Sequence, residues 1–399
     1  MKRGLKENLL QMKKSFKILL ALLILLTLLF FFVAPTLLER VANKVISQET
    51  QKLSAKAAEL HDQLWIADLH ADALLWNRDL LERNDHGHVD VPRLIEGNVA
   101  LQAFTVVSKI PNGLNFESNP ADNFDLITLL GIAQRWPSET WRSLRARALF
   151  QANKLKKVEK NSGGKFKIIR TQQDLIKYNL MRRSNPGMTA GFLGLEGSQV
   201  LEGELGNVQV LFDAGFRMMA PTHFFDTEVG GSAHGEKKGG LTEFGKKVIQ
   251  YMQRIGMIVD VAHASPKTID DILDMSTKPI FVSHTGVRGT CDNVRNLSDE
   301  HLKGVAATGG VIGIAFFEQA TCGEDVDSIV RAIQYTANLV GVEHVALGSD
   351  WDGAVATPFD AAHISHLTQA LLDAGFAGSE IALIMGGNVQ RLLLEILPH

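Results

Sequence analysis

Histidine and carboxylate side chains recur directly after short apolar runs of this sequence. They stand in the segments D-L-H-A-D (68–72), L-E-G (195–197), T-H (222–223), V-D-V-A-H (259–263), V-S-H (282–284) and G-S-D-W-D-G (348–353). Imidazole nitrogens and carboxylate oxygens are common ligands of Zn²⁺ and related divalent cations. One such residue alone is more often a hydrogen-bonded structural histidine or a surface acid. Its repetition after six apolar runs indicates a metal centre.

The spacing of these residues predicts two cations rather than one. Residues two apart in an extended segment point the same way, so His70 and Asp72 can bind the same ion. The two carboxylate oxygens of Glu196 can bridge two ions, and a water held between them would have its pKa lowered to about 7. Three more histidines follow other apolar runs, namely His223, His263 and His284. The chemistry expected is attack of that water on an amide or ester carbonyl, with Zn²⁺ favoured and Mn²⁺, Co²⁺ or Fe²⁺ as alternatives.

An acidic group follows the last apolar run, and the sequence offers two choices for it. Asp350 falls nearer the predicted end of the strand, whereas Asp352 lies in a turn that contains Gly353. Catalytic groups of a parallel barrel stand at the carboxyl ends of its strands, so Asp350 is the preferred choice.

Eight apolar or alternating runs must position these side chains. They are residues 64–69, 100–107, 190–195, 217–221, 257–261, 279–283, 310–315 and 344–348, and helical patterns follow them. Strands that alternate with helices predict a parallel sheet, and eight such units predict a (β/α)8 barrel of the TIM type. Helix starts are signalled at Thr242, at Ser265 before Pro266 and at Ser298.

The N-terminal segment differs from the rest of the chain. An uncharged run over residues 18–38 is long enough to span a hydrocarbon layer of roughly 30 Å as a helix. Six cationic side chains precede it, namely Lys2, Arg3, Lys6, Lys13, Lys14 and Lys17, and only Arg40 follows closely. The positive-inside rule therefore places the N-terminus in the cytoplasm and residues 41–399 outside, as a single-pass membrane protein.

The chain divides into three expected parts. Residues 1–40 form a cytoplasmic basic tail and a transmembrane signal-anchor helix, residues 41–62 a helical stalk, and residues 63–399 the barrel domain. That domain carries an insertion at about 112–178, in which the basic run 154–167 is expected to be a solvated face. A glycine-rich stretch over 226–240 is expected to be a mobile loop. The whole chain has a formal net charge of −3 although its first residues are basic, which argues against nucleic acid as a partner.

These motifs, in this order, resemble those of the membrane (renal-type) dipeptidase family of zinc metallopeptidases, which is amidohydrolase-like. The resemblance covers residues 64–399 apart from the insertion, and further matching segments are V-P-R-L (91–94), L-T-E-F-G (241–245) and R-N-L-S-D (295–299). It implies a binuclear-zinc hydrolase on a barrel.

The resemblance also implies a role for each site residue. His70 and Asp72 would bind one zinc, His263 and His284 the other, and Glu196 would bridge them. His223 would contact the substrate carbonyl and its developing oxyanion. Arg295 would bind the substrate, by clamping the terminal carboxylate or steadying the oxyanion, with an ordinary surface salt bridge as the alternative. Asp350 would transfer a proton to the leaving amine or bind the free amino group.

Two further features come from the resemblance. Cys291 and Cys322 match a cysteine pair that is bridged in animal members, and a homodimer is implied. The family can supply a tyrosine near the substrate, but residues 311–322 contain none.

The function expected is therefore hydrolysis of the peptide bond of dipeptides by a metal-bridging hydroxide, with Glu196, His223 and Asp350 as catalytic residues. Two alternatives remain open. One is a related metal-dependent hydrolase of lactones, β-lactams or cyclic amides, since the same activated water serves all of these. The other is a non-catalytic scaffold tethered to the membrane.

Overall fold

The computed structural model describes residues 2–46 and 52–399, and its core is a closed parallel barrel. The barrel strands are β2 (Ile66–Ala71), β3 (Val99–Phe104), β5 (Thr189–Leu195), β6 (Phe216–Met219), β7 (Ile258–Val259), β8 (Phe281–Thr285), β9 (Val311–Ile314) and β10 (Val345–Leu347). Their order is β7-β6-β5-β3-β2-β10-β9-β8. A parallel bridge between Asp260 and Phe281 joins the two ends, where Val261 N donates to Phe281 O at 2.9 Å. Each strand overlaps one of the eight predicted runs, so the predicted fold class is confirmed.

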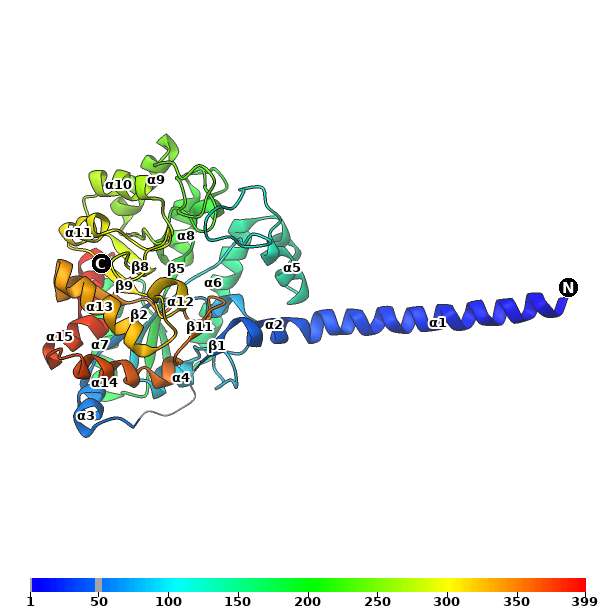
Figure 1. The fold of residues 1–399 in the computed structure, drawn as a ribbon, viewed down its shortest axis with the longest axis horizontal. Coiled ribbons are helices and arrows are strands. Elements are labelled where there is room, and N and C mark those ends of the chain that lie inside the picture. The colour runs from blue at the N-terminus through cyan, green and yellow to red at the C-terminus, as the bar shows by residue number, and fades with distance from the viewer. Residues whose placement is uncertain (1, 47–51) are drawn as a thin grey trace.

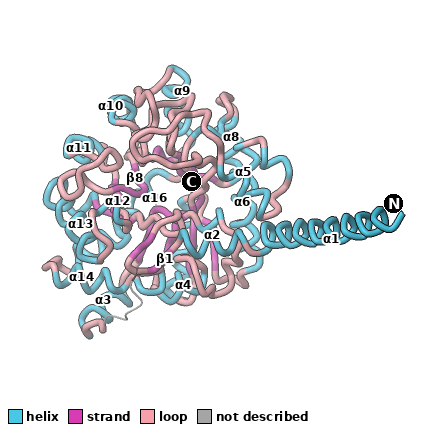
Figure 2. The backbone as a smooth tube through the Cα atoms, turned by 45° about the vertical axis from the view of Figure 1, so that its right-hand side comes forward, coloured by secondary structure: helices cyan, strands magenta, loops and turns pink. Residues whose placement is uncertain are grey.

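Helices surround these strands, as Figure 2 shows. They are α4 (Val91–Glu96), α5 (Leu126–Ala133), α6 (Leu144–Asn161), α7 (Gln172–Ser184), α8 (Asn207–Ala214), α9 (Glu243–Ile255), α10 (Pro266–Met275), α11 (Asp299–Ala307), α12 (Glu318–Thr321), α13 (Val326–Val340), α14 (Ser365–Asp373), α15 (Gly378–Ala382) and α16 (Asn388–Ile396). The predicted caps are present: Thr242, Ser265 and Ser298 each accept a hydrogen bond from a backbone N–H in the first turn. These caps satisfy donors that a helix start leaves unpaired.

The stretch between β3 and β5 contains α5, α6, a short strand β4 (Phe166–Ile168) and α7. Strand β4 pairs with β5, so this part of the chain is built onto the barrel. Lys154 departs from the expected solvated face, because its Nζ donates to the backbone oxygens of Leu74 and Trp76. The amine of Lys154 is therefore buried, which is unusual for a lysine and lowers its pKa.

The N-terminal helix α1 (Lys2–Phe32) extends away from the barrel (Figure 1). Its segment Asn8–Phe32 is long and apolar enough to cross a membrane, and none of it is buried by the rest of the protein. The expected span ran to residue 38, but the helix ends at Phe32 and a second helix, α2 (Ala34–Ala42), begins with Pro35 in its first turn. Proline lacks an N–H and is tolerated only there, which explains the break.

The segment expected to be a stalk lies against the barrel where the structure describes it. Strand β1 (Lys44–Val45) pairs in parallel with β11 (Ala356–Thr357), which follows β10. Helix α3 (Ala55–Gln63) buries His61, whose Nδ1 lies 2.8 Å from Thr368 Oγ1 of α14. Residues 47–51 of the expected stalk lie outside the described residues. Residues 44–46 and 55–63 therefore pack against the barrel domain, and they do not form a helix that leads off the membrane.

Candidate metal and active site

The predicted site residues meet at the carboxyl ends of the barrel strands. His70 is on β2 and Asp72 follows it, Glu196 follows β5, His223 follows β6, His263 follows β7, His284 is on β8 and Asp350 follows β10. Asp350 is 9% exposed and the others are 5% exposed or less. So many ionisable groups enclosed together would be unstable without a counter-ion or a shared proton.

Glu196 lies at the centre of this cluster. Its Oε1 is 3.1 Å from His263 Nε2, 3.4 Å from His284 Nε2 and 3.6 Å from His70 Nε2. Its Oε2 is 3.2 Å from His223 Nε2. Four imidazoles thus aim their Nε2 atoms at one carboxylate, an arrangement that fits a group bridging two cations.

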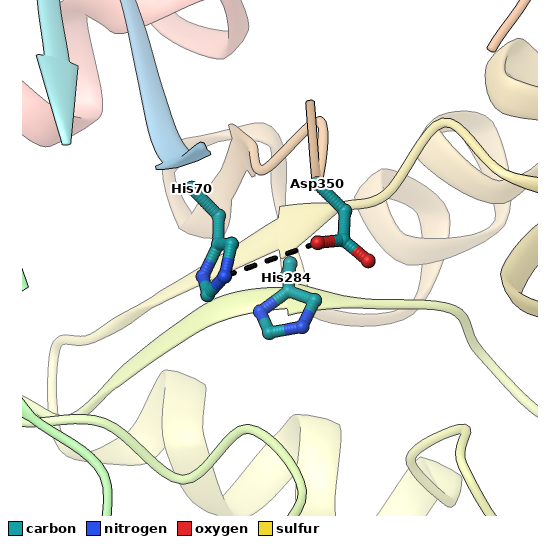
Figure 3. Close-up of side chains that lie close together, drawn as sticks. All are labelled: His70, His284 and Asp350. Carbon is teal, nitrogen blue, oxygen red and sulfur yellow. Dashed lines mark ion pairs between the residues drawn. The ribbon is translucent and has the colours of Figure 1, made fainter. Parts of the chain in front are cut away.

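His70 connects Glu196 with the two aspartates. Its Nε2 lies 3.6 Å from Asp72 Oδ1 and 3.9 Å from Asp350 Oδ1. Figure 3 shows the side chains of His70, His284 and Asp350 pointing toward one another from β2, β8 and the loop after β10. Among the described residues His70 Nε2 has no hydrogen-bond partner. A buried nitrogen without a partner is costly, and a bound cation would satisfy it.

The protonation states of the histidines suit metal binding. Burial, helped by neighbouring cationic groups, lowers the pKa of His223, His263 and His284 well below the ordinary value. These three imidazoles are therefore neutral, which is the form that binds a metal. Burial also opposes protonation of His70, but Glu196 and Asp72 outweigh it and raise the pKa of His70 to about 10. The carboxylates around His70 thus attract positive charge, whether a proton or a divalent cation.

Three groups of side chains have donor atoms close enough to hold a metal ion. They are His70 with Asp72 and Glu196, Glu196 with His223 and His263, and His70 with His284 and Asp350. The donor atoms of each group lie within 4.8 Å of one another. The donor set is mixed imidazole and carboxylate, which suits zinc. The residues present therefore fit a bound divalent cation, and Glu196 belongs to two of the three groups.

Two hydroxyl groups that the sequence analysis did not select orient these ligands. Ser283 Oγ lies 3.1 Å from His70 Nδ1 and 2.9 Å from His284 Nδ1, so both Nε2 atoms are left free for a metal. Thr105 Oγ1 donates to Asp72 Oδ1 at 2.7 Å. Such supporting contacts fix ligand orientation. The only sign of Ser283 and Thr105 in the sequence is that each is a polar residue within one of the predicted apolar runs.

Arg295 is buried beside the cluster rather than at the surface, so the salt-bridge alternative does not describe it. It is 3% exposed, and its Nη2 donates to His284 O at 2.8 Å. Its Nε and Nη1 have no partner among the described residues. The loop that carries it is joined to the end of α12 by a disulfide between Cys291 and Cys322, with Cα atoms 5.4 Å apart. A guanidinium with two free donors can bind a carboxylate.

The two aspartates after β10 have different surroundings. Asp352 is fully buried and receives hydrogen bonds from Arg78 and from the backbone N–H groups of His88 and Val89. Burial would raise the pKa of Asp352, but Arg78 outweighs it and holds that pKa below its usual range. Asp350, by contrast, lies on the cavity beside His70. Asp350, Asp352 and His263 all adopt left-handed backbone conformations, with φ of 63°, 62° and 60°. Strain of this kind in non-glycine residues is frequent at functional sites.

A cavity of about 210 Å³ opens onto the cluster. Asp72, Glu196, His223, His263, His284 and Asp350 line its polar end, and the remaining lining is mostly apolar. The glycine-rich stretch 226–240 packs close by. Its His234 is fully buried and lies 2.6 Å from Phe116 O through Nδ1, which links this stretch to the segment after β3. His234 was not selected from the sequence because no apolar run precedes it.

Comparison with known proteins identifies the family to which the chain belongs. The family model for membrane dipeptidases, peptidase family M19, matches residues 54–397. Dipeptidase aclJ of Aspergillus oryzae is 27% identical over 352 residues, which cover 83% of this chain and 78% of that protein. Dipeptidase tcpJ of Claviceps purpurea is 26% identical over 367 residues, which cover 88% and 81%.

Solved structures share the fold at lower identity. The probable dipeptidase PvdM from Pseudomonas aeruginosa has a TM-score of 0.72 and 18% identity, with 86% of this chain and 98% of that chain covered. A metallopeptidase from Rhodobacter sphaeroides, solved with a phosphinate mimic of the dipeptide L-Ala-D-Ala, has a TM-score of 0.67 and 22% identity, with 84% and 99% covered. From the family match over most of its length and the dipeptidases it resembles, the chain belongs to the membrane dipeptidase family and is a metal-dependent hydrolase of the dipeptidase class.

Proposed function

We propose that this protein is a binuclear-zinc dipeptidase that hydrolyses the peptide bond of dipeptides. The observation that carries the proposal is Glu196, whose carboxylate lies within 3.6 Å of the Nε2 atoms of His70, His223, His263 and His284. His70 and Asp72 would hold one zinc and His263 and His284 the other, with Glu196 as the ligand shared between them. When bound, two zinc ions supply an activated water and polarise a carbonyl oxygen.

The other polar groups of the site bind the substrate and move protons. His223 is neutral and can donate an N–H to the carbonyl oxygen as that oxygen gains negative charge. Arg295 offers its two free donors, Nε and Nη1, to the carboxylate of the dipeptide. Asp350 lies beside His70 on the cavity, where it can bind the free amino group or return a proton to the leaving amine. Asp352 is excluded from these roles because Arg78 and two backbone N–H groups occupy it.

The relatives support the choice of substrate class. The fungal relatives carry the name dipeptidase, and the ligand of the Rhodobacter sphaeroides structure imitates a dipeptide with a D-residue at its second position. We therefore include dipeptides of both configurations among the substrates to be tested.

We also propose a membrane topology for the protein. Residues 1–40 anchor it through α1, and residues 63–399 form the catalytic domain on the extracytoplasmic side, where the disulfide between Cys291 and Cys322 would persist. A homodimer, as the resemblance implies, stays a prediction. Maleimide labelling of denatured protein from membranes tests the disulfide: labelling only after reduction supports this placement, and labelling without reduction contradicts it.

Release of free amino acids from a panel of L,L-, L,D- and D,L-dipeptides tests the proposed activity. The whole chain in detergent should be used, because Leu38 and Ala42 of α2 line the cavity and a truncated protein would lack part of its wall. Cleavage that a chelator removes and zinc restores is the expected result. A fully metallated protein that cleaves no dipeptide, but opens a lactone, β-lactam or cyclic amide, would overturn the proposal. A protein that binds no metal would indicate a scaffold instead.

A further inference from the structure

The helix that follows the candidate membrane span forms part of the active-site wall. Leu38 and Ala42 of α2 line the same cavity as Asp72, Glu196 and Asp350. Leu38 is 51% exposed although it lines this cavity. The anchor segment therefore reaches the substrate site itself.

The wall to which α2 contributes is apolar. The cavity is lined by Leu75, Trp76, Val107, Ile127 and Leu130, which are all buried. They form one hydrophobic cluster, and Ala42 of α2 packs against it. The polar groups of the cavity are confined to the metal end, so a substrate that fills the cavity must present an apolar group to this wall.

Buried polar contacts fix α2 in place. Glu39 forms an ion pair with Arg78, which also pairs with Asp352 in the loop after β10. Asn43 Oδ1 accepts a hydrogen bond from Ala354 N at 2.9 Å, and β1 continues the contact by pairing with β11. The loop that carries Asp350 is thus bound to the helix that carries Leu38, and the wall is a built part of the site.

The position of Arg295 tells which end of a dipeptide meets this wall. Arg295 donates to the backbone oxygen of His284, which lines the apolar cavity, but Arg295 itself lines a second cavity of about 430 Å³ together with Phe116, Cys291 and Asn293. Asp350, by contrast, lines the apolar cavity beside Ala354. If Arg295 holds the substrate carboxylate and Asp350 the amino group, the N-terminal residue of the dipeptide is the one beside α2.

We infer that the enzyme selects dipeptides with a bulky apolar side chain on the N-terminal residue, and that Leu38 of the membrane-exit helix is a specificity residue for that side chain. The inference rests on the proposed dipeptidase function. The apolar group has two sources: a free dipeptide such as Leu-Gly or Phe-Gly, or a membrane-associated one with a long alkyl side chain, which the exposed Leu37 and Val41 of α2 would also accommodate.

The test compares kcat/KM of the whole zinc-loaded chain in lipid nanodiscs for matched dipeptides. Leu-Gly and Phe-Gly should exceed Ala-Gly by about tenfold or more, which is the scale of discrimination in an apolar pocket. Gly-Leu and Gly-Phe should show no such gain over Gly-Ala. 2-Aminodecanoyl-glycine, with its eight-carbon side chain, distinguishes the sources: it should be preferred over Leu-Gly if the substrate is membrane-associated and disfavoured if it is a free dipeptide.

Substitutions in α2 test whether Leu38 determines the specificity. Leu38→Asp, and more mildly Leu38→Ala, should lower the ratio of kcat/KM for Leu-Gly over Ala-Gly several-fold. Leu37→Asp is the matched control, because Leu37 is equally exposed but does not line the cavity, and it should keep the wild-type ratio. Metal content and thermal midpoint of each variant establish that it is folded.

The outcomes separate the two proposals. If Ala-Gly, Leu-Gly and Gly-Leu are cleaved equally well, or if both Leu38 variants keep the wild-type ratio, the inference is wrong while the dipeptidase function stands. If the zinc-loaded protein cleaves none of them, the proposed function itself fails.

Discussion

Ser283 supplies one hydroxyl to two imidazoles of the metal site. Its Oγ lies within hydrogen-bond distance of the Nδ1 atoms of His70 and His284, which are assigned to different metals. Orientation of both rings therefore depends on a single residue. Loss of such a supporting contact commonly weakens metal binding because the free ligand then samples unproductive orientations.

The substitution Ser283→Ala should weaken zinc binding by about 10- to 100-fold. Competition with a chromophoric chelator measures the affinity. Ser276→Ala is a suitable control, because Ser276 Oγ donates to Ile272 O at the end of α10 and the change removes a comparable hydroxyl away from the metals. Equal zinc affinity in the two variants would show that Ser283 does not position the ligands.

Lys154 gives the fold a defined dependence on pH. Burial lowers the pKa of Lys154 to about 7, whereas in the unfolded chain an ordinary lysine has a pKa of about 10.4. Between these values the unfolded chain binds more protons than the folded one, so the free energy of unfolding rises with pH. The rise from this residue is at most about 1.4 kcal/mol per pH unit.

Replacing Lys154 with Met should remove that contribution. Thermal unfolding of the metal-loaded protein at pH 7, 8 and 9 should show wild-type stability rising relative to the Lys154→Met variant as pH increases. Lys157→Met, which changes an exposed lysine of the same helix α6, should follow the wild type. Parallel profiles for wild type and Lys154→Met would contradict the assignment of a neutral amine.

The site residues predicted from the sequence are brought together in the structure. They could be predicted because apolar runs mark the strand ends and only a few residue types bind metals. His70, Asp72, Glu196, His223, His263, His284, Asp350 and Arg295 all lie at one mouth of the barrel. The sequence did not select Ser283, Thr105 or His234. Serine, threonine and histidine occur in many structural roles. Only the contacts of Ser283 with His70, of Thr105 with Asp72 and of His234 with Phe116 distinguish these three.

At the scale of elements, helix α2 links the candidate membrane span to the loop that carries Asp350. Its Glu39 is 2% exposed and pairs with Arg78. Burial raises the pKa of Glu39 even though Arg78 opposes the shift. An ion pair in such surroundings adds little net stability over apolar packing, but removing one partner leaves a buried charge poorly satisfied.

The substitution Glu39→Gln should therefore loosen α2. Hydrogen bonds to charged groups contribute about 1.5–3 kcal/mol, so backbone amides of α2 should exchange with deuterium about tenfold faster or more. Exchange followed by mass spectrometry measures this directly. Glu59→Gln, at an exposed position of α3, is the control and should leave α2 protection as it is. Unchanged protection in Glu39→Gln would mean that apolar contacts alone hold the helix.

The eight barrel strands could be predicted because each combines an apolar run with a turn or helix signal, and every predicted run overlaps an observed strand. The contacts of β1 and α3 with the barrel domain, within the segment 41–62 expected to be a stalk, could not be predicted because they are long-range. Strand β1 has only two residues and pairs with β11, more than 300 positions away in sequence. No local periodicity encodes such a pairing, and Glu39 gives no sign that its partner is Arg78.

At the scale of the whole molecule, the barrel places its metal site beside the helix that leads to the candidate membrane span. Figure 1 shows α5 next to the junction of α1 and α2, where the guanidinium of Arg135 lies over the Phe32 ring at 4.7 Å. Near this junction the described surface exposes the apolar side chains Phe124, Leu126 and Leu129. The site and the candidate membrane span are therefore linked through α2, and the activity should be studied in the whole chain.

The proposed activity requires two cations that share Glu196, and a metal titration of the whole apo chain tests this requirement most directly. Zinc is added in fractions of an equivalent while bound metal and hydrolysis of Leu-Gly are both measured. We expect two tightly bound equivalents of zinc, with turnover appearing as the second is bound. The Glu196→Ala variant should lose both bound metal and turnover. Full turnover with one bound equivalent or none, or a Glu196→Ala variant that keeps two metals and full activity, would contradict this requirement.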